Sequence, residues 1–366
     1  MVCIFCIIES FGYTNDSKPL KCEDKIAAEA QKRYVRPNDA AFEPLSHHKI
    51  CSTTLAARSS SKHGGFAAGI SEVIILTSPF DEIDWNEVWK AQMKRSKEAI
   101  PARDCARIWE GRTSALKFWN MSQENSGRVE KTIAGTDITP ESRVLDIGAG
   151  PGTLAIPFAK RVAHVTVVEP AEGMLSVLRE KMAEEGVENI DVVQKRWEDV
   201  FVADDLHTPY DVVIASFSLG MADIRAAVEK MIAAAATGGH IYLYHFAGET
   251  HWDRECRELW PKLHDKEYTP GPKSDVLYNV LYQMGIYPSV RTFRLLHTQR
   301  FGSMEVAMEH FRHQYRITTA EQKAIVREHL GRVLMEVNGG FVLPASSTRV
   351  KIWWETGSQE DGLVES

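Results

Sequence analysis

The pattern of apolar and polar positions divides the chain into a stretch without a sustained period and a longer stretch with clear helix and strand signals. Residues 1–80 show no such period, and Ser46 to Gly65 is rich in Ser, His, Ala and Lys, which is typical of a flexible segment. From Asp81 to about Gly135, apolar residues recur at helical spacing. We therefore predict a flexible N-terminal tail over residues 1–80 and a helical cap over residues 81–139.

Beyond the cap, short β-branched runs alternate with amphipathic segments, which predicts a mostly parallel sheet with helices on both faces. The predicted strands are Val144–Ile147, Val165–Val168, Ile190–Val193, Asp211–Ala215, Ile241–His245, Val290–Leu296 and Arg349–Trp354. The predicted helices are Thr153–Arg161, Ala171–Glu184, Ala222–Ala236, Met304–Tyr315 and Ala320–Val337. This α/β domain spans residues 140–356 and carries helical additions at about 246–289 and 299–346, before a C-terminal tail at 357–366.

Three alternating glycines join the first predicted strand to the helix that follows it. Gly148, Gly150 and Gly152 permit a tight turn with no side chain in the way, so a ligand can approach the backbone there. A dinucleotide fingerprint would need its third small residue at Thr153. The observed spacing, preceded by Asp146, instead resembles the first motif of class I S-adenosylmethionine-dependent methyltransferases. A nucleotide-binding oxidoreductase and a glycine turn without a ligand remain the alternatives.

A carboxylate at the end of the second strand supports the methyltransferase interpretation. Glu169 lies 19 positions beyond Gly150 and precedes Pro170, where a carboxylate can accept both hydroxyls of a ribose. The resemblance implies a Rossmann-like sheet of seven strands with the last antiparallel, and S-adenosylmethionine as the cofactor. The cofactor-binding residues that we predict are Asp146, Gly148, Ala149, Gly150, Gly152, Glu169, Pro170, Met174, Arg196, Trp197, Glu198 and Ser216.

After the third strand, the chain departs from the family pattern. The family usually places an acidic residue on the adenine amino group, followed by a small residue whose backbone NH meets the ring. Arg196 and Trp197 align with these two positions. The adenine contact could instead come from Glu198 or Asp199, and the Trp197 indole could cover the ring.

The fourth strand ends at Ser216, on the carboxyl edge where ligands of open α/β sheets bind. We expect Ser216 to lie near the reacting methyl group. The residues after it match neither the Asn/Asp-Pro-Pro-Tyr/Phe motif of enzymes that methylate amide or adenine amino nitrogens nor the Pro-Cys of cytosine C5 enzymes. His245, at the end of the fifth strand, is the candidate general base. A purely structural imidazole is the alternative, and no metal is expected.

Two further regions carry expectations about the acceptor. Trp109, Arg112 and Trp119 of the cap either pack as core or close over the cofactor as a lid. The additions near the last strands are dense in aromatic residues, and loops and insertions commonly carry recognition. We therefore expect substrate recognition to lie in these additions.

The composition of the chain limits its expected partners and its expected location in the cell. The chain has 366 residues, 44% of them hydrophobic and 25% charged, with a formal net charge of −7, which argues against a nucleic-acid partner. Cys3 and Cys6 lack a second pair at zinc-site spacing. Met1 to Ile8 is too short to span a bilayer and lacks the basic start of a signal peptide. We expect a cytoplasmic protein without a membrane segment, although a later translation start would leave the first residues unmade.

The sequence leaves three functional hypotheses open. The first is a methyltransferase acting on an O, N, S or C atom of a small-molecule acceptor. The second is a methyltransferase acting on a protein or RNA, and the third is a non-catalytic S-adenosylmethionine-binding module. The acidic charge and the aromatic additions favour the first hypothesis. The sequence does not indicate an oligomeric state.

Overall fold

The computed structural model describes residues 80, 82–100, 109–124 and 126–357. Residues 1–79 of the predicted tail and residues 358–366 at the other end lie outside the described residues. The elements discussed here belong to one compact unit that includes Ile83–Ser366.

The helices are α3 (Trp85–Ala99), α5 (Arg112–Glu124), α6 (Ser126–Ile133), α7 (Ala155–Ala159), α8 (Glu172–Glu185), η1 (Trp197–Asp199), α9 (Val202–Asp205), α10 (Ile224–Ala234), α11 (His251–His264), α12 (Ser274–Gln283), α13 (Met304–Gln314) and α14 (Ala320–Val333). The strands are β1 (Arg143–Ile147), β2 (His164–Val168), β3 (Ile190–Val193), β4 (Tyr210–Ser216), β5 (Ala235–Phe246), β6 (Ser289–Phe301), β7 (Met335–Val337) and β8 (Gly340–Glu355).

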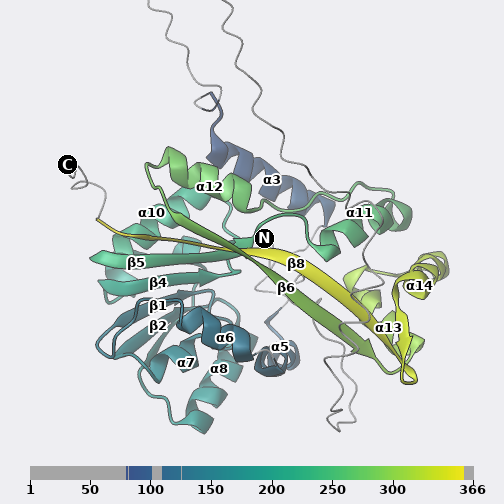
Figure 1. Cartoon of the computed structure of the whole chain (residues 1–366), viewed down its shortest axis with the longest axis horizontal. Coiled ribbons are helices and arrows are strands. Elements are labelled where there is room, and N and C mark those ends of the chain that lie inside the picture. The colour runs from purple at the N-terminus through teal and green to yellow at the C-terminus, as the bar shows by residue number, and fades with distance from the viewer. Residues whose placement is uncertain (1–79, 81, 101–108, 125, 358–366) are drawn as a thin grey trace, which may run out of the picture. The chain divides into compact units, whose positions relative to one another are not determined.

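The strands form one mostly parallel sheet in the order β3-β2-β1-β4-β5-β8-β6, with β7 paired to β8 (Figure 1). The first five strands pair in parallel, whereas β8 runs antiparallel to β5 and to β6. The order reverses between β1 and β4, which creates the crevice where ligands of such sheets bind. The predicted α/β class and Rossmann-like sheet are confirmed.

The described part of the sheet has eight strands where seven were predicted. The added strand is β7, which occupies the end of the predicted helix Ala320–Val337; the helix itself ends at Val333. Asn338 and Gly339 both have positive φ, 52° and 78°, as a two-residue hairpin turn between β7 and β8 requires. The Asn-Gly pair is therefore the local signal for this hairpin.

Alternating side chains bury both faces of the sheet. Val144, Val212 and Ile214 belong to a core shared with α5, α6, α7 and α8. Leu145 and Val213 belong to a second core, shared with α3, α10 and α12. Because successive side chains of a strand point to opposite faces, each face carries its own layer of helices, as Figure 1 shows. None of the helices in the described part of the chain is long and apolar enough to cross a membrane.

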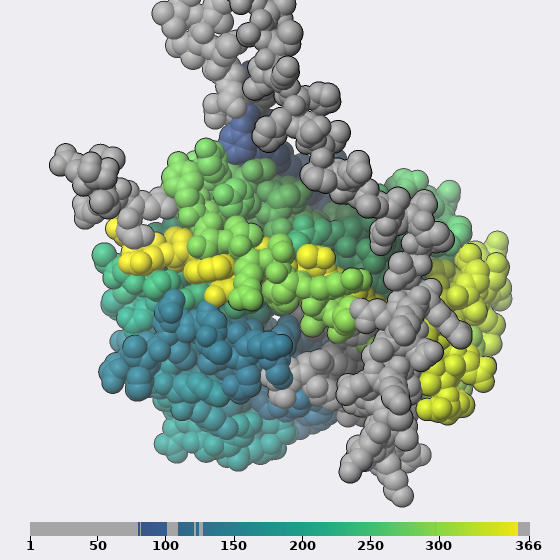
Figure 2. Space-filling model, viewed as in Figure 1, coloured from purple at the N-terminus to yellow at the C-terminus, as the bar shows by residue number. Residues whose placement is uncertain are grey.

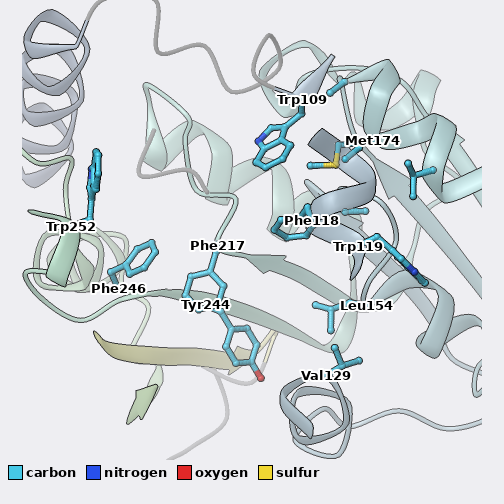
Figure 3. Packing of buried hydrophobic residues seen from close by; sticks show 14 of the residues in the cluster. Trp109, Phe118, Trp119, Val129, Leu154, Met174, Phe217, Tyr244, Phe246 and Trp252 are labelled. Carbon is cyan, nitrogen blue, oxygen red and sulfur yellow. The ribbon is translucent and has the colours of Figure 1, made fainter. Parts of the chain in front are cut away.

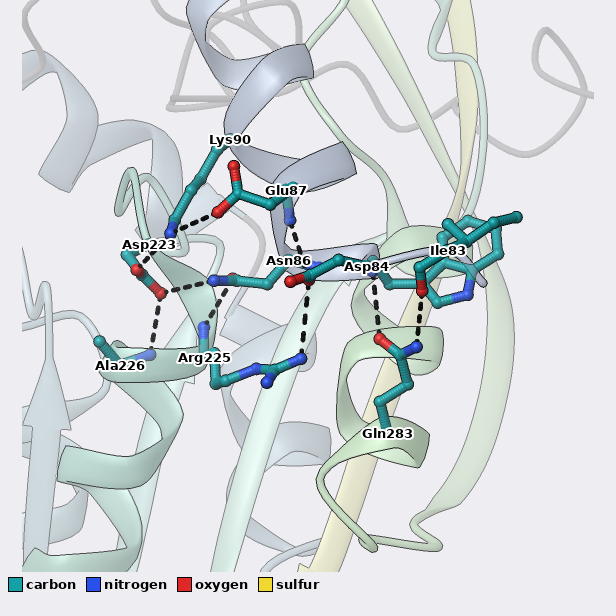
Figure 4. Close-up of polar contacts among 10 residues, drawn as sticks. Ile83, Asp84, Asn86, Glu87, Lys90, Asp223, Arg225, Ala226 and Gln283 are labelled. Carbon is teal, nitrogen blue, oxygen red and sulfur yellow. Dashed lines mark hydrogen bonds and ion pairs between the residues drawn. The ribbon is translucent and has the colours of Figure 1, made fainter. Parts of the chain in front are cut away.

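A polar network fixes the start of α3 (Figure 4). Asp84 caps the helix by accepting hydrogen bonds from the backbone N–H groups of Asn86 and Glu87. The Asn86 side chain donates to Asp223 at 3.0 Å and accepts from the Arg225 backbone at 3.1 Å, both at the start of α10. The predicted cap is thus divided, because α3 packs against α10 and α12 while α5 packs against α8.

The additions near the last strands are divided, because α12 packs against α3 and α10 whereas α11, α13 and α14 form a helical cluster around the far ends of β6 and β8. Figure 2 shows the yellow-green atoms of α14 and β7 at the right of this face, opposite the teal atoms of β5. The ring of Trp252 in α11 stacks on Tyr315 at 5.1 Å between centroids. Gln322 in α14 donates to the Leu263 carbonyl at 2.6 Å. The aromatic residues of this region therefore serve largely as its own core.

Candidate cofactor and acceptor site

Two of the three alternating glycines are required by close packing of the fold. Gly148 and Gly152 have φ of 72° and 85°, a region that residues with a side chain rarely adopt. A Cβ on Gly148 would lie 2.4 Å from the Ser218 Cβ, and a Cβ on Gly152 would lie 2.4 Å from the Leu178 Cδ1. Gly152 packs against α8 and does not line the cavity described below, so its cofactor contact stays a prediction.

The middle glycine is different, because its open side faces the cavity. Gly150 has φ of 58°, and the atom nearest to an added Cβ would be the Met174 sulfur at 3.9 Å. Its backbone N–H donates to Glu169 Oε2 at 3.0 Å. The loop therefore presents bare backbone to the cavity at Gly150, as a closely bound ligand requires.

Glu169 ties the ends of β1 and β2 together. Its Oε1 accepts from the Ala171 N–H at 2.9 Å while its Oε2 accepts from Gly150. Burial raises the pKa of this carboxyl, and the two backbone hydrogen bonds oppose the rise. Because each carboxylate oxygen can accept more than one hydrogen bond, Glu169 keeps capacity to accept the hydroxyls of a ribose.

Asp146 lies beside this loop and is almost completely buried. Its residue is 2% exposed, and its Oδ2 has no hydrogen-bond partner among the described residues. Burial, with a smaller contribution from the nearby Glu169, raises the pKa of Asp146 to about 7. A buried acceptor without a partner is costly, and a cationic ligand group in the cavity would relieve this cost.

At the opposite wall, η1 carries the segment that aligns with the family's adenine contacts. Arg196, Trp197 and Glu198 all line the cavity. The Trp197 Nε1 donates to the Ala227 carbonyl at 3.1 Å, which fixes the indole against α10. Lys230 donates to the carbonyls of Trp197 and Glu198 at 2.8 and 3.0 Å. This lysine, which sequence reasoning missed, holds the wall in place.

Aromatic residues wall the cavity beyond the end of β4. Ser216 lines the cavity, and Phe217 follows it with a φ of 58°. Trp109 and Phe118 line it from the cap, their rings in an edge contact at 5.6 Å between centroids. Figure 3 shows Trp109 and Phe118 approaching from one side and Phe217 from the end of β4. The cavity thus continues from the glycine loop into an apolar region.

This single cavity is lined by every predicted cofactor residue except Gly152. Asp199, the alternative to Glu198, does not line it. The lining residues that sequence reasoning did not assign to the site are Trp109, which it weighed only as part of a lid, and Phe118, Arg128, Ile147, Thr153, Leu154, Val168, Phe217, Ser218, Gly220 and Met221. Ile147, Thr153, Val168 and Phe217 directly flank predicted positions, and that adjacency was the signal that could have found these four. Arg128 has no such signal, because α6 reaches the cavity only through tertiary packing.

His245 is the clear departure from the predicted site. It does not line the cavity, its residue is 1% exposed, and its Nε2 lies 3.0 Å from the Pro272 carbonyl. Its ring lies 5.8 Å from the ring of Trp89 in α3. Burial lowers the pKa of His245 to about 3, so it is neutral at physiological pH. Since side chains alternate along a strand, Tyr244 faces the α6 side of the sheet and His245 faces the other side. The structure therefore supports the structural alternative for this histidine.

The expectations about the lid and the additions are also modified. Trp109 lines the cavity, but Trp119 is buried in the core and Arg112 pairs with Glu180 of α8. No residue of the additions at 246–289 or 299–346 is among the described residues that line the cavity. The expectation that substrate recognition lies in these additions stays a prediction, and several of their rings pack against one another.

The comparisons with known proteins agree with this geometry. Residues 144–239 match a family model described as a methyltransferase domain. An uncharacterized protein of Haemophilus influenzae is 31% identical over 116 residues, which cover 32% of this chain and 42% of that protein. A ubiquinone/menaquinone biosynthesis C-methyltransferase of Vibrio campbellii is 32% identical over 143 residues, which cover 36% of this chain and 54% of that protein. The chain spans about half the length of these curated relatives.

A solved structure, the YcgJ protein from Bacillus subtilis, covers 64% of this chain and is itself covered to 98%, with 18% identity and a TM-score of 0.44. The family assignment depends on the matched segment, which includes β1, the glycine loop, Glu169 and β4. The strand order of this chain and the conformation of its glycine turn agree with the resemblance found in the sequence. Residues 144–239 thus carry a methyltransferase domain, which is similar to that of the class I S-adenosylmethionine-dependent methyltransferases.

Proposed function

We propose that this protein transfers the methyl group of S-adenosylmethionine to an O, N, S or C atom of a small-molecule acceptor. One observation carries the proposal: the glycine loop, Glu169 and Asp146 share a single cavity with the aromatic walls beyond Ser216. A cofactor bound along the loop would therefore direct its methyl group toward an apolar space. That space suits an acceptor of limited size.

The cofactor would supply a methyl group on a sulfonium. As an electron pair of the acceptor atom forms the bond to the methyl carbon, the sulfur–methyl bond breaks, the sulfur departs as a neutral thioether, and any proton on the acceptor atom is released to solvent. In this proposal Glu169 accepts the ribose hydroxyls, and the buried Asp146 carboxyl neutralises the positive charge of the methionine portion. Trp109, Phe118 and Phe217 exclude water and hold the acceptor in line. Among the described cavity residues there is no histidine, so the proposal assigns catalysis to positioning and exclusion of water, without a general base.

Two observations favour a small molecule over a protein or RNA acceptor. The walls beyond Ser216 come from two sides, with Trp109 and Phe118 from the cap and Phe217 from the sheet. The Vibrio campbellii relative is named for methylation at carbon in quinone biosynthesis, which includes carbon among the possible acceptor atoms. A macromolecular acceptor would need an open groove beside Ser216.

Transfer of a labelled methyl group from S-adenosylmethionine tests the proposal. The full chain is incubated with a cell extract separated into a small-molecule fraction and a macromolecular fraction. We expect label in the small-molecule fraction. Label only in protein or RNA would favour the second hypothesis, and tight cofactor binding without transfer to either fraction would favour a non-catalytic module.

A substitution at Glu169 tests the cofactor part. We expect Glu169→Ala to weaken S-adenosylmethionine binding by about 10- to 100-fold, because hydrogen bonds to a charged group contribute roughly 1.5 to 3 kcal/mol. Isothermal titration calorimetry measures the change. Glu172→Ala is the matched control, since Glu172 lies nearby on α8, does not line the cavity and pairs with Arg179 at 2.8 Å. Equal affinities of the two folded variants would contradict the assignment.

A further inference from the structure

Arg128 is a cation at the acceptor end of the cavity. It lies on α6, lines the cavity, and has its guanidinium carbon 5.8 Å from the centre of the Phe217 ring. Among the side chains that the structure describes, no carboxylate forms an ion pair with it. Three arginines on α5, α7 and α8 or next to these helices do pair with carboxylates. These ion pairs are Arg112 with Glu180, Arg161 with Glu130 and Arg179 with Glu172.

The charge of Arg128 is only weakly compensated. Burial lowers its pKa, and the Tyr244 phenol is the ionisable group that opposes this effect. Burial in turn raises the pKa of Tyr244 to about 12, so the phenol is neutral at physiological pH. A guanidinium remains protonated in proteins, and a partly desolvated cation without a counter-ion stabilises an anion placed beside it.

The guanidinium belongs to the acceptor part of the cavity. Its guanidinium lies over the ring of Phe217, the residue directly after Ser216. Arg128 is therefore associated with the end of β4.

The surroundings of Arg128 also indicate the shape of its ligand. The rings of Trp109, Phe118 and Phe217 line the same cavity, and flat rings pack well against a planar molecule. Resting on the methyltransferase activity proposed above, we propose that the acceptor is an aromatic carboxylate whose carboxylate pairs with Arg128 while its ring lies against these walls. A guanidinium can hold such a group through two parallel hydrogen bonds.

A pair of probes that differ only in charge tests this inference. The full chain, saturated with S-adenosylhomocysteine, is titrated by calorimetry with trans-cinnamate and with trans-cinnamide. We expect the wild type to bind cinnamate at least about tenfold more tightly than cinnamide, because a hydrogen bond to a charged group provides about this difference in affinity. Arg128→Met should reduce this preference to within about twofold, and Arg128→Lys should retain part of it. Arg112→Met is the matched control, because Arg112 does not line the cavity, and it should keep the wild-type preference.

The affinity for S-adenosylhomocysteine, measured in the same experiment, provides the decisive contrast. We expect Arg128→Met to change it by no more than about twofold. A tenfold loss of cofactor affinity with an unchanged cinnamate preference would show that Arg128 serves the cofactor carboxylate, which would overturn the inference. Equal affinities of the wild type for the two probes, or no measurable binding of cinnamate, would also overturn it. The titration with the two probes is repeated without S-adenosylhomocysteine in order to separate the two proposals. If the protein does not bind the cofactor but still prefers cinnamate to cinnamide, only the proposed function is contradicted.

Discussion

At the scale of single residues, the alternating glycines of the loop have different physical reasons. Gly148 and Gly152 leave room for Ser218 and Leu178, whereas Gly150 leaves room on the side of the cavity. In this motif, packing of the fold requires two of the glycines, and access of a ligand to the backbone requires the third. Substitutions at the three positions should consequently differ in what they damage.

We predict that Gly150→Val abolishes cofactor binding while the protein stays folded. A β-branched residue at φ of 58° costs roughly 1 to 3 kcal/mol in strain, which a fold of this size tolerates, but its methyl groups would occupy the open side of the loop. Gly186→Val is the control, because Gly186 has φ of 65° with nothing within 4 Å of an added Cβ. Calorimetry with S-adenosylhomocysteine compares them, and normal binding by Gly150→Val would rule out the loop as the cofactor cradle.

A second prediction at this scale concerns Asp146 and pH. Its pKa is about 7 in the folded chain because it is buried, whereas an unfolded Asp titrates near ~3.9. Between these values the folded state holds a proton that the unfolded state has lost, so this group makes the protein less stable as pH rises. The loss is about 1.4 kcal/mol per pH unit within that window.

The measurement is the thermal midpoint of the cofactor-free protein from about pH 4.5 to pH 7. Other groups titrate over the same range, so the comparison is with Asp146→Asn, which cannot ionise. We expect the wild type to lose more stability than Asp146→Asn as pH rises. Parallel curves for the two proteins would mean that Asp146 is already ionised at the low end.

At the scale of elements, the wall formed by the cap depends on a close backbone approach to α8. A Cβ on Gly173, in the first turn of α8, would lie 2.2 Å from the Trp109 carbonyl oxygen and 2.5 Å from that of Glu110. The same α8 packs against α5 and receives the ion pair from Arg112 to Glu180. Gly173 therefore sets how closely Trp109 can approach the cavity.

We predict that Gly173→Ala lowers the thermal midpoint by about 2 to 10 °C, since overpacking costs typically 1 to 3 kcal/mol. It should also weaken S-adenosylhomocysteine binding, because the Trp109 wall must move. Gly127→Ala in α6 is the matched control, as an added Cβ there meets nothing within 4 Å. If Gly173→Ala kept both the wild-type midpoint and the wild-type affinity, the close approach would not position the wall.

At the scale of the whole molecule, the site lies where the strand order reverses, so the cofactor residues come from both sides of that point. Asp146 comes from β1, Glu169 follows β2, and Ser216 ends β4. A ligand that contacts all three bridges elements that are far apart in the chain. Because it binds only when these elements are assembled, it should stabilise the entire fold.

We predict that S-adenosylhomocysteine at about 100 times its Kd raises the free energy of unfolding by about 2.7 kcal/mol, or the thermal midpoint by about 5 to 10 °C. Glu169→Ala at the same ligand concentration should show about half of this gain or less. Differential scanning calorimetry measures both proteins. An equal gain for the two would place the ligand away from Glu169.

Local sequence signals were sufficient to predict much of the fold and of the candidate site. The β-branched runs predicted β1 to β4 closely, and the glycine spacing with Glu169 predicted residues that the fold brings into one cavity. These features succeed because strand propensity, turn conformation and the spacing of a strand-helix-strand unit depend on neighbouring residues. The Asn338-Gly339 pair is a local signal of the same kind, although the sequence analysis predicted a helix through Val337 and missed this hairpin.

Tertiary packing decided what local pattern could not. His245 and Tyr244 are adjacent, yet only the face of β5 that each occupies determines that His245 contacts Trp89 and stays out of the cavity. Arg128 reaches the cavity because α6 packs on one face, while α3, from the same predicted cap, packs on the other. The face that a helix covers depends on burial summed over contacts distant in sequence. The sequence by itself therefore determined the parallel strands, the loop and the cofactor class, and only the tertiary structure decided which side chains line the cavity.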